Sequence, residues 1–138
     1  MKTPRMIALA ILATALLAYS AGIAQAQTSE QIPRILRTQE RIMRAAEALE
    51  RNLNRPDAQN RIDQLVTEAR DLITLLENSR WAILHSQSRE ARTVRELTKK
   101  AHFALVTGRD LETARAHMRT VCSLTTTMLN QTMHTGMR

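Results

Sequence analysis

The sequence predicts an all-α protein, and three observations carry that prediction. The 138 residues include only three glycines and three prolines, and aromatic residues make up 2% of the chain. Long uninterrupted stretches of Ala, Leu, Arg, Glu and Gln favour helix, whereas sheets favour β-branched and aromatic residues with frequent turns. Apolar residues also recur in steps of three, four and seven, which is typical of amphipathic helices.

The first 26 residues have the layout of a secretory signal peptide. Lys2 and Arg5 precede an apolar run over residues 6–23, and the small residues Ala24 and Ala26 then flank Gln25. This order of basic, apolar and small-residue segments predicts cleavage near Ala26 and a periplasmic or secreted protein. The run of about 18 residues is near the lower limit for spanning a bilayer, so a retained anchor is the alternative.

Residues 27–138 are long enough for one helical domain with its own core. Lys2 and Arg5 are the only charged residues before Gln27, so the net charge of +7 becomes +5 for this domain. Cys122 is the single cysteine and cannot form a disulfide within the chain. We expect a buried, inert thiol; an intermolecular bridge or a reactive or metal-binding thiol is the alternative.

A first helix is expected to end near Leu53, with Thr28 as its N-terminal cap and Gln31 three residues later. The polar segment 52–57 contains Pro56, which blocks continuation but can open a second helix. The predicted apolar stripe of the first helix is Ile35, Ile42, Ala46, Leu49 and Leu53.

The region after Pro56 leaves two architectures open, because residues 57–107 contain neither Gly nor Pro. A turn at 85–88, with Ser88 as a cap, gives an up-down-up-down four-helix bundle, which we favour. Without that turn, a single helix of about 76 Å would form an elongated, dimeric hairpin rod. The expected stripe is Ile62, Leu65, Val66, Ala69, Leu72, Ile73, Leu76, Ile83, Val94, Leu97, Ala101, Ala104 and Leu105, with residues 81–84 buried on several sides.

Gly108 is expected to stop this helical region and Asp110 to cap the last helix. Several threonines lower the helix propensity there, so its end is expected to fray. Its predicted core face is Leu111, Ala114, Met118, Val121, Cys122, Met128 or Leu129, and Met133.

No catalytic constellation is evident, so we do not expect an enzyme. The sequence contains no Gly-rich phosphate loop, nucleophile elbow, HExxH or CxxC. Most charges instead indicate a solvated surface, and four acid-before-base pairs spaced four residues apart support the exposed helices. These pairs are Glu30/Arg34, Glu40/Arg44, Glu47/Arg51 and Asp57/Arg61.

The segment 80–102 has a net charge of +4 and is the candidate binding surface. An ordinary solvated face is the alternative. As a functional strip it would bind an acidic protein or an anionic envelope surface, with Trp81 as an apolar anchor. The candidate partner-binding residues are Trp81, Arg89, Arg92, Arg95 and Lys99. Nucleic acid is not expected, because no aromatic platform for bases is present.

The C-terminal helix offers a competing function, soft-metal binding. Thioether and thiol ligands suit copper(I), and residues four apart share one helix face. The candidate ligands are His117, Met118, Cys122, Met133 and His134. Core packing of the methionines and the cysteine is the alternative, since Met fills irregular gaps.

The predicted layout resembles that of cytochrome b562-like exported bundles. That resemblance implies b-type haem between a Met near the start of the first helix and a His near the end of the last. His134 is near the C-terminus, but Met43 lies in the middle of the first helix, so we expect no cofactor. The sequence therefore predicts a non-catalytic binding component of the bacterial cell envelope. A homodimer is compatible with this prediction, and copper binding is the alternative function.

Overall fold

The computed structural model describes residues 31–136, and these are helical except for short connections, with no strand among them. The predicted signal peptide and the predicted Thr28 cap lie outside the described residues. An N-terminal helix covers residues 31–51, followed by α2 (Ala58–Glu77), α3 (Ala82–Ser86), α4 (Ser88–Phe103), a π-helical turn (Ala104–Gly108) and α5 (Leu111–Gly136). The predicted all-α helical bundle is confirmed.

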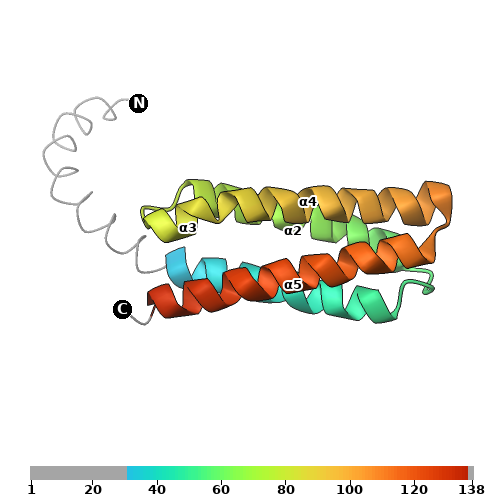
Figure 1. Cartoon of the computed structure of the whole chain (residues 1–138), viewed down its shortest axis with the longest axis horizontal. Coiled ribbons are helices and arrows are strands. Elements are labelled where there is room, and N and C mark those ends of the chain that lie inside the picture. The colour runs from blue at the N-terminus through green and yellow to red at the C-terminus, as the bar shows by residue number, and fades with distance from the viewer. Residues whose placement is uncertain (1–30, 137–138) are drawn as a thin grey trace, which may run out of the picture. The chain divides into compact units, whose positions relative to one another are not determined.

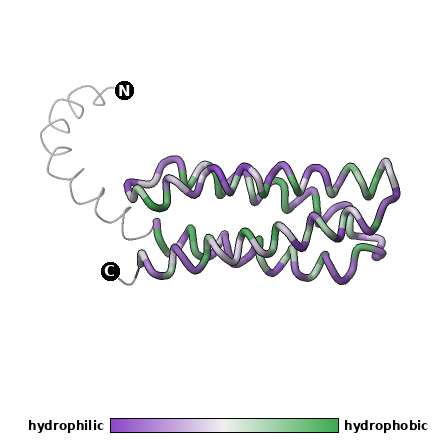
Figure 2. Tube along the Cα trace, in the orientation of Figure 1, coloured by the Kyte–Doolittle hydropathy of each residue, from purple (hydrophilic) through white to green (hydrophobic). Residues whose placement is uncertain are grey.

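The N-terminal helix, α2, α4 and α5 lie lengthwise beside one another in Figure 1. The connection over 52–57 and the α4–α5 connection lie at one end of these helices, and α3 lies at the other end. Hydrophilic and hydrophobic residues alternate along each long helix in Figure 2, as amphipathic helices require. No helix within residues 31–136 is long and apolar enough to cross a bilayer.

The core follows the predicted stripes closely. All five stripe residues of the N-terminal helix are buried, and so are six of those in α2: Ile62, Leu65, Ala69, Leu72, Ile73 and Leu76. In the second half of the chain, the buried apolar residues are Leu84, Ala91, Val94, Ala101, Ala104, Ala114, Met118, Val121 and Met128. Because the apolar steps match the helical period, each helix buries one face and exposes the other.

The alternative of a single helix over 57–107 is wrong, because α2, α3 and α4 are separate helices. The main break lies at residues 78–81, about two helical turns before the 85–88 turn that we expected. The backbone N–H of Ser79 donates to Leu76 O at 3.1 Å, and the Ser79 hydroxyl accepts from the N–H of Trp81 at 3.2 Å. Ser and Asn side chains compete in this way with the helical hydrogen bonds, and Asn78 and Ser79 therefore end α2.

The burial expected around Trp81 is also wrong, for the same reason. Trp81 is 36% exposed and Ile83 is 47% exposed, and only Leu84 of this segment is buried. The break changes the angular register of residues 81–84, so that only one of them faces the core. Ser88 is not a cap either: it is the first residue of α4, and Gln87 precedes it in a helical conformation.

The α4–α5 connection also differs from the prediction in its details. The left-handed residue is Arg109, with φ at 51°, rather than Gly108. The backbone N–H groups of Arg109 and Asp110 both donate to Ala104 O, which closes the end of the helical region. This is the pattern of a left-handed helix C-terminus, with Arg in the position that Gly usually takes.

Helix α5 contains several threonines and continues to Gly136. The hydroxyls of Thr125 and Thr132 donate to the carbonyls of Val121 and Met128, four residues earlier, at 2.6 and 2.9 Å. These hydrogen bonds satisfy hydroxyl groups that would otherwise be buried without a partner. At the two ends of the expected core face, Leu111 and Met133 are 37% and 44% exposed, which corrects that prediction.

Candidate functional site

The outward face of α4 carries most of the predicted basic strip. The side chains on the buried face are Ala91, Val94, Thr98 and Ala101, and at 100° per residue the opposite face is centred near residues 89, 96 and 103. We define the α4 basic face as Arg89, Arg92, Lys99, Lys100 and Phe103, all of which are exposed.

Part of this charge is neutralised by carboxylates. Arg92 forms an ion pair with Glu77 of α2. Glu96 lies 3.7 Å from the Lys99 ammonium and 3.6 Å from Arg95, measured between charged nitrogen and oxygen atoms. Exposed pairs of this kind are weak and leave the cations available to other anions.

Arg89 and Lys100 form no ion pair within residues 31–136 and are the free cations of the α4 basic face. Arg95 lies at the margin of this face, with 35% of its side chain exposed. Arg95, which was a predicted binding residue, is therefore not fully exposed on this face, whereas Lys100, which was not among the predicted binding residues, is exposed there.

Phe103 is the residue that the sequence-based prediction of the site missed. It is 65% exposed, more than any other large apolar residue of the described chain. An exposed aromatic ring is unfavourable in water, since burial of such a side chain contributes about 1.5–3 kcal/mol. The signal was present in the sequence: Phe103 falls off the apolar stripe of Leu97, Ala101 and Ala104, and lies three residues after Lys100.

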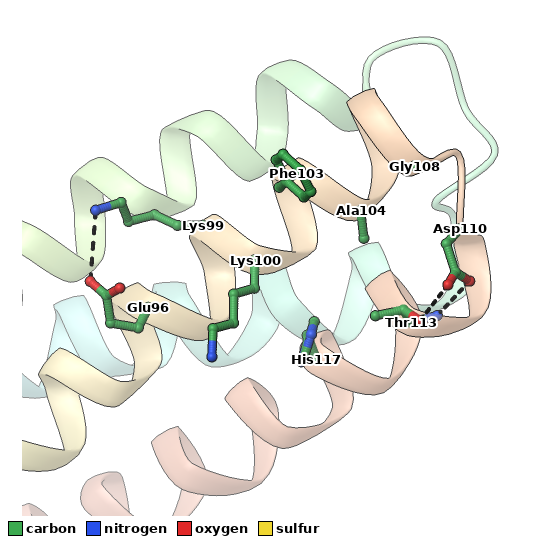
Figure 3. A pocket seen from close by; sticks show the side chains of 9 residues that line it. All are labelled: Glu96, Lys99, Lys100, Phe103, Ala104, Gly108, Asp110, Thr113 and His117. Atoms are coloured by element: carbon green, nitrogen blue, oxygen red, sulfur yellow. Dashed lines mark hydrogen bonds and ion pairs between the residues drawn. The ribbon is translucent and has the colours of Figure 1, made fainter.

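An open groove of about 460 Å³ lies beside Phe103, where α4 meets α5. We call it the α4–α5 groove, and Figure 3 shows its lining side chains. Lys100 extends from α4 toward α5, and His117 points from α5 into the space between the helices (Figure 3). The groove is lined by Glu96, Lys99, Lys100, Phe103, Ala104, Gly108, Asp110, Thr113 and His117.

The two carboxylates of this groove are already engaged within the chain. Glu96 faces Lys99, as Figure 3 shows. Asp110 accepts hydrogen bonds from the backbone N–H and the hydroxyl of Thr113, at 3.1 and 2.6 Å. Those two bonds hold the pKa of the Asp110 carboxyl below its ordinary value of 3.8. The side chains left to contact a ligand are the Lys100 ammonium, the His117 ring and the apolar surface of Phe103.

Trp81 does not belong to the same compact site. It lies at the break between α2 and α3, whereas Phe103 ends α4. The 16 residues of α4 span about 24 Å, and Figure 1 shows α3 and the α4–α5 connection at opposite ends of the bundle. A small ligand cannot contact both aromatic rings.

The structure does not bring the five candidate metal ligands together. Met118 is fully buried in the core, whereas the neighbouring His117 lines the α4–α5 groove. Met133 is exposed, and Met118 and Met133 are 15 residues apart on one helix, which corresponds to about 22 Å. The ring of His134 is exposed, and its Nδ1 lies 2.9 Å from Asn130 O. No cluster of three or more His, Cys, Asp or Glu residues able to hold a metal ion occurs within residues 31–136.

Cys122 is half-buried and packs beside the core rather than in its centre. Its burial raises the pKa of the thiol above 9.0, and the carboxylates of Glu47 and Glu50 raise it further. A thiol with a raised pKa is a poor nucleophile and a poor metal ligand at neutral pH, because the thiolate is the reactive form.

Comparisons of this chain with protein-family models, with curated proteins and with solved structures gave no match.

Proposed function

We propose that this protein is a non-catalytic binding component of the bacterial cell envelope, and that it binds an acidic partner protein through the α4–α5 groove. The observation that carries this proposal is Phe103, an aromatic side chain 65% exposed to solvent beside Lys99 and Lys100. The envelope location rests on the predicted signal peptide.

The chemistry of the groove favours a partner segment that combines a carboxylate with an apolar side chain. The apolar side chain would cover the Phe103 ring and remove it from water. The carboxylate would bind the free Lys100 ammonium, while Lys99 and Arg89 extend the positive potential along the α4 basic face. Positive potential of this kind accelerates the encounter with an acidic partner more than it increases the final affinity.

Site-specific photocross-linking in living cells tests this proposal. A benzoylphenylalanine residue at position 103 retains an aromatic ring at the site and reacts with whatever lies against it. The matched control places the same residue at Ile83, which is also an exposed apolar position but lies at the opposite end of the bundle.

We expect one discrete cross-linked product at position 103, absent at position 83, whose yield falls as the salt concentration rises. Screening by salt follows from an electrostatic contribution to binding. Equal cross-linking at both positions, or a yield at position 103 that does not depend on salt, would contradict the proposal.

A further inference from the structure

A second groove lies between the N-terminal helix and α2, on residues that the α4–α5 groove does not use. Its volume is about 500 Å³. Three arginines, at positions 34, 37 and 41, occupy one wall; their spacing of three and four residues places them on one helix face. We call it the arginine groove, and it is lined by Arg34, Arg37, Thr38, Arg41, Asp71, Thr74 and Leu75.

The arginines of this groove have too few anionic partners within the described chain. Arg41 forms an ion pair with Glu68 through its Nε at 3.1 Å. Arg34 and Arg37 are exposed and form no ion pair within residues 31–136. Like charges three and four residues apart on a helix repel each other weakly, and an anion bound between these arginines would relieve that repulsion.

The opposite wall supplies hydrogen-bond acceptors. Asp71 lines the groove, and its carboxylate forms no ion pair within residues 31–136. On the same wall, the exposed hydroxyl of Thr74 donates to the carbonyl of Arg70 at 3.2 Å. Because its proton is engaged, the Thr74 hydroxyl oxygen remains available as an acceptor.

One ligand class satisfies both walls. Guanidinium groups bind phosphate oxygens through two parallel N–H bonds, and a phosphate monoester carries a charge of about −1.5 to −2 at neutral pH. The Asp71 carboxylate and the Thr74 hydroxyl oxygen can only accept hydrogen bonds, so the ligand must supply the donors. Sugar hydroxyls are such donors. A ligand with phosphate alone would leave Asp71 repelling it.

We propose that the arginine groove binds a phosphorylated sugar, with the phosphate on Arg34 and Arg37 and the sugar hydroxyls on Asp71. This site shares no residue with the α4–α5 groove, so a test of one site does not depend on the result at the other. The same chemistry occurs in free sugar phosphates and in the phosphorylated sugar headgroup of a lipid.

Nuclear magnetic resonance titration of the purified protein tests the site with defined probes: glucose 6-phosphate, inorganic phosphate and glucose. We expect saturable shifts over residues 34–41 and 71–75 with glucose 6-phosphate, weaker binding of inorganic phosphate, and none of glucose. Vesicles of phosphatidylcholine with and without phosphatidylinositol 4-phosphate distinguish the sources. Co-sedimentation with the phosphorylated vesicles alone identifies a lipid headgroup, whereas binding of glucose 6-phosphate alone identifies a free sugar phosphate.

Three variants sharpen the test. Arg37→Lys retains the charge but loses the bidentate geometry, and should weaken binding of glucose 6-phosphate about tenfold. Asp71→Asn should weaken the sugar phosphate and strengthen inorganic phosphate, because the amide no longer repels the anion. The control is Arg44→Lys, an exposed arginine of the same helix that does not line the groove.

Two results would overturn the proposal. The first is no saturable binding of either glucose 6-phosphate or the phosphorylated vesicles at millimolar phosphate. The second is equal binding of glucose 6-phosphate and inorganic phosphate that Asp71→Asn does not separate, since this would show only nonspecific attraction of anions to surface arginines. All of the substituted residues are exposed, and circular dichroism of each variant verifies that it remains helical.

Discussion

Asp110 fixes the start of α5 with both oxygens of its carboxylate. It accepts hydrogen bonds from the backbone N–H and the hydroxyl of Thr113, which matches the geometry of an N-terminal helix cap. The Asp110 cap was predicted from the sequence, because a short acidic residue follows Gly108 and precedes an apolar stripe. A cap of this kind satisfies a backbone donor that the helix itself leaves without a partner.

Asp110→Ala should lower the urea midpoint of unfolding at neutral pH without changing the slope of the transition. Asp110→Asn should retain most of the stability, since Asn caps helices about as well as Asp. The pKa of Asp110 is lowered below 3.8 in the folded chain, so its charged form contributes stability above that value. This contribution is lost as the pH falls through the lowered pKa. The difference in urea midpoint between wild type and Asp110→Ala should therefore become smaller over that pH range.

Cys122 should react slowly with iodoacetamide in the folded protein. Burial and the nearby carboxylates raise the pKa of its thiol above 9.0, so few thiolates exist at neutral pH. The measurement compares the alkylation rate of the folded chain with that of the chain in urea, over a range of pH. We expect faster alkylation in urea throughout the neutral range, and equal rates would contradict the assigned environment.

The raised pKa of Cys122 also has a consequence for stability. The folded state retains the thiol proton more strongly than the unfolded state, so this contribution is complete below the unfolded pKa and is lost as the pH rises through the folded pKa. Cys122→Ser should therefore reduce the loss of stability at alkaline pH.

At the scale of the helices, a buried polar network joins three elements of the bundle. Gln39 of the N-terminal helix and Gln87, at the start of α4, are almost completely buried. Gln39 Nε2 donates to Gln87 Oε1 at 2.9 Å, and Gln87 Nε2 donates to Met128 O and to Gln131 Oε1, at 3.2 and 3.0 Å. The network pairs three of the four polar side-chain atoms of these two residues, whereas Gln39 Oε1 is buried without a hydrogen-bond partner among the described residues.

Gln87→Leu should destabilise the protein by about 1–3 kcal/mol, because it leaves the Gln39 amide buried without its partner. The other groups are less affected: Met128 O still accepts from the Thr132 hydroxyl, and Gln131 is exposed. The double variant Gln39→Leu/Gln87→Leu should be more stable than Gln87→Leu alone, since both polar partners are then removed together. Urea denaturation of the wild type, Gln87→Leu and the double variant measures this difference, and a double variant no more stable than Gln87→Leu would contradict it.

The positions of the helices were largely predictable from the sequence, but the break at residues 78–81 was not. Ile35, Ile42 and Leu65 repeat at helical spacing, and this periodicity alone identifies the buried faces. The break depends on Asn78 and Ser79, which are weaker signals than Gly or Pro, while Ser86 and Ser88 looked equally suitable. The packing of the flanking helices decides whether the chain breaks at 78–81 or at 85–88. The local sequence pattern does not contain that information.

The candidate site was predictable only in part, because exposure depends on tertiary packing. Arg89, Arg92 and Lys99 share the outward face that their spacing predicted. Phe103 does not fall on the apolar stripe, but phenylalanine is usually buried, so its exposure was not expected from the sequence. The arginine groove requires Arg37 of the N-terminal helix and Asp71 of α2 to line one groove, and this arrangement appears only once the helices are packed.

At the scale of the molecule, ion pairs join neighbouring helices around the core. Arg41 binds Glu68 of α2 at 3.1 Å, and Arg119 of α5 binds Glu50 of the N-terminal helix at 2.9 Å. Exposed pairs contribute little each, so the apolar core provides most of the stability. The charges of the α4 basic face are therefore free to serve binding, and substitutions there should leave the fold intact.

The measurement that tests the central claim most directly is photocross-linking at position 103 in a chain that also carries Lys99→Glu and Lys100→Glu. Its matched control carries Arg44→Glu and Arg70→Glu, two exposed arginines outside the α4–α5 groove with the same change of charge. The account predicts that the cross-linked product is lost from the first chain and retained in the control, while both chains remain helical. A product that survives reversal of both lysines, or that disappears equally from the control, would contradict binding through the α4–α5 groove.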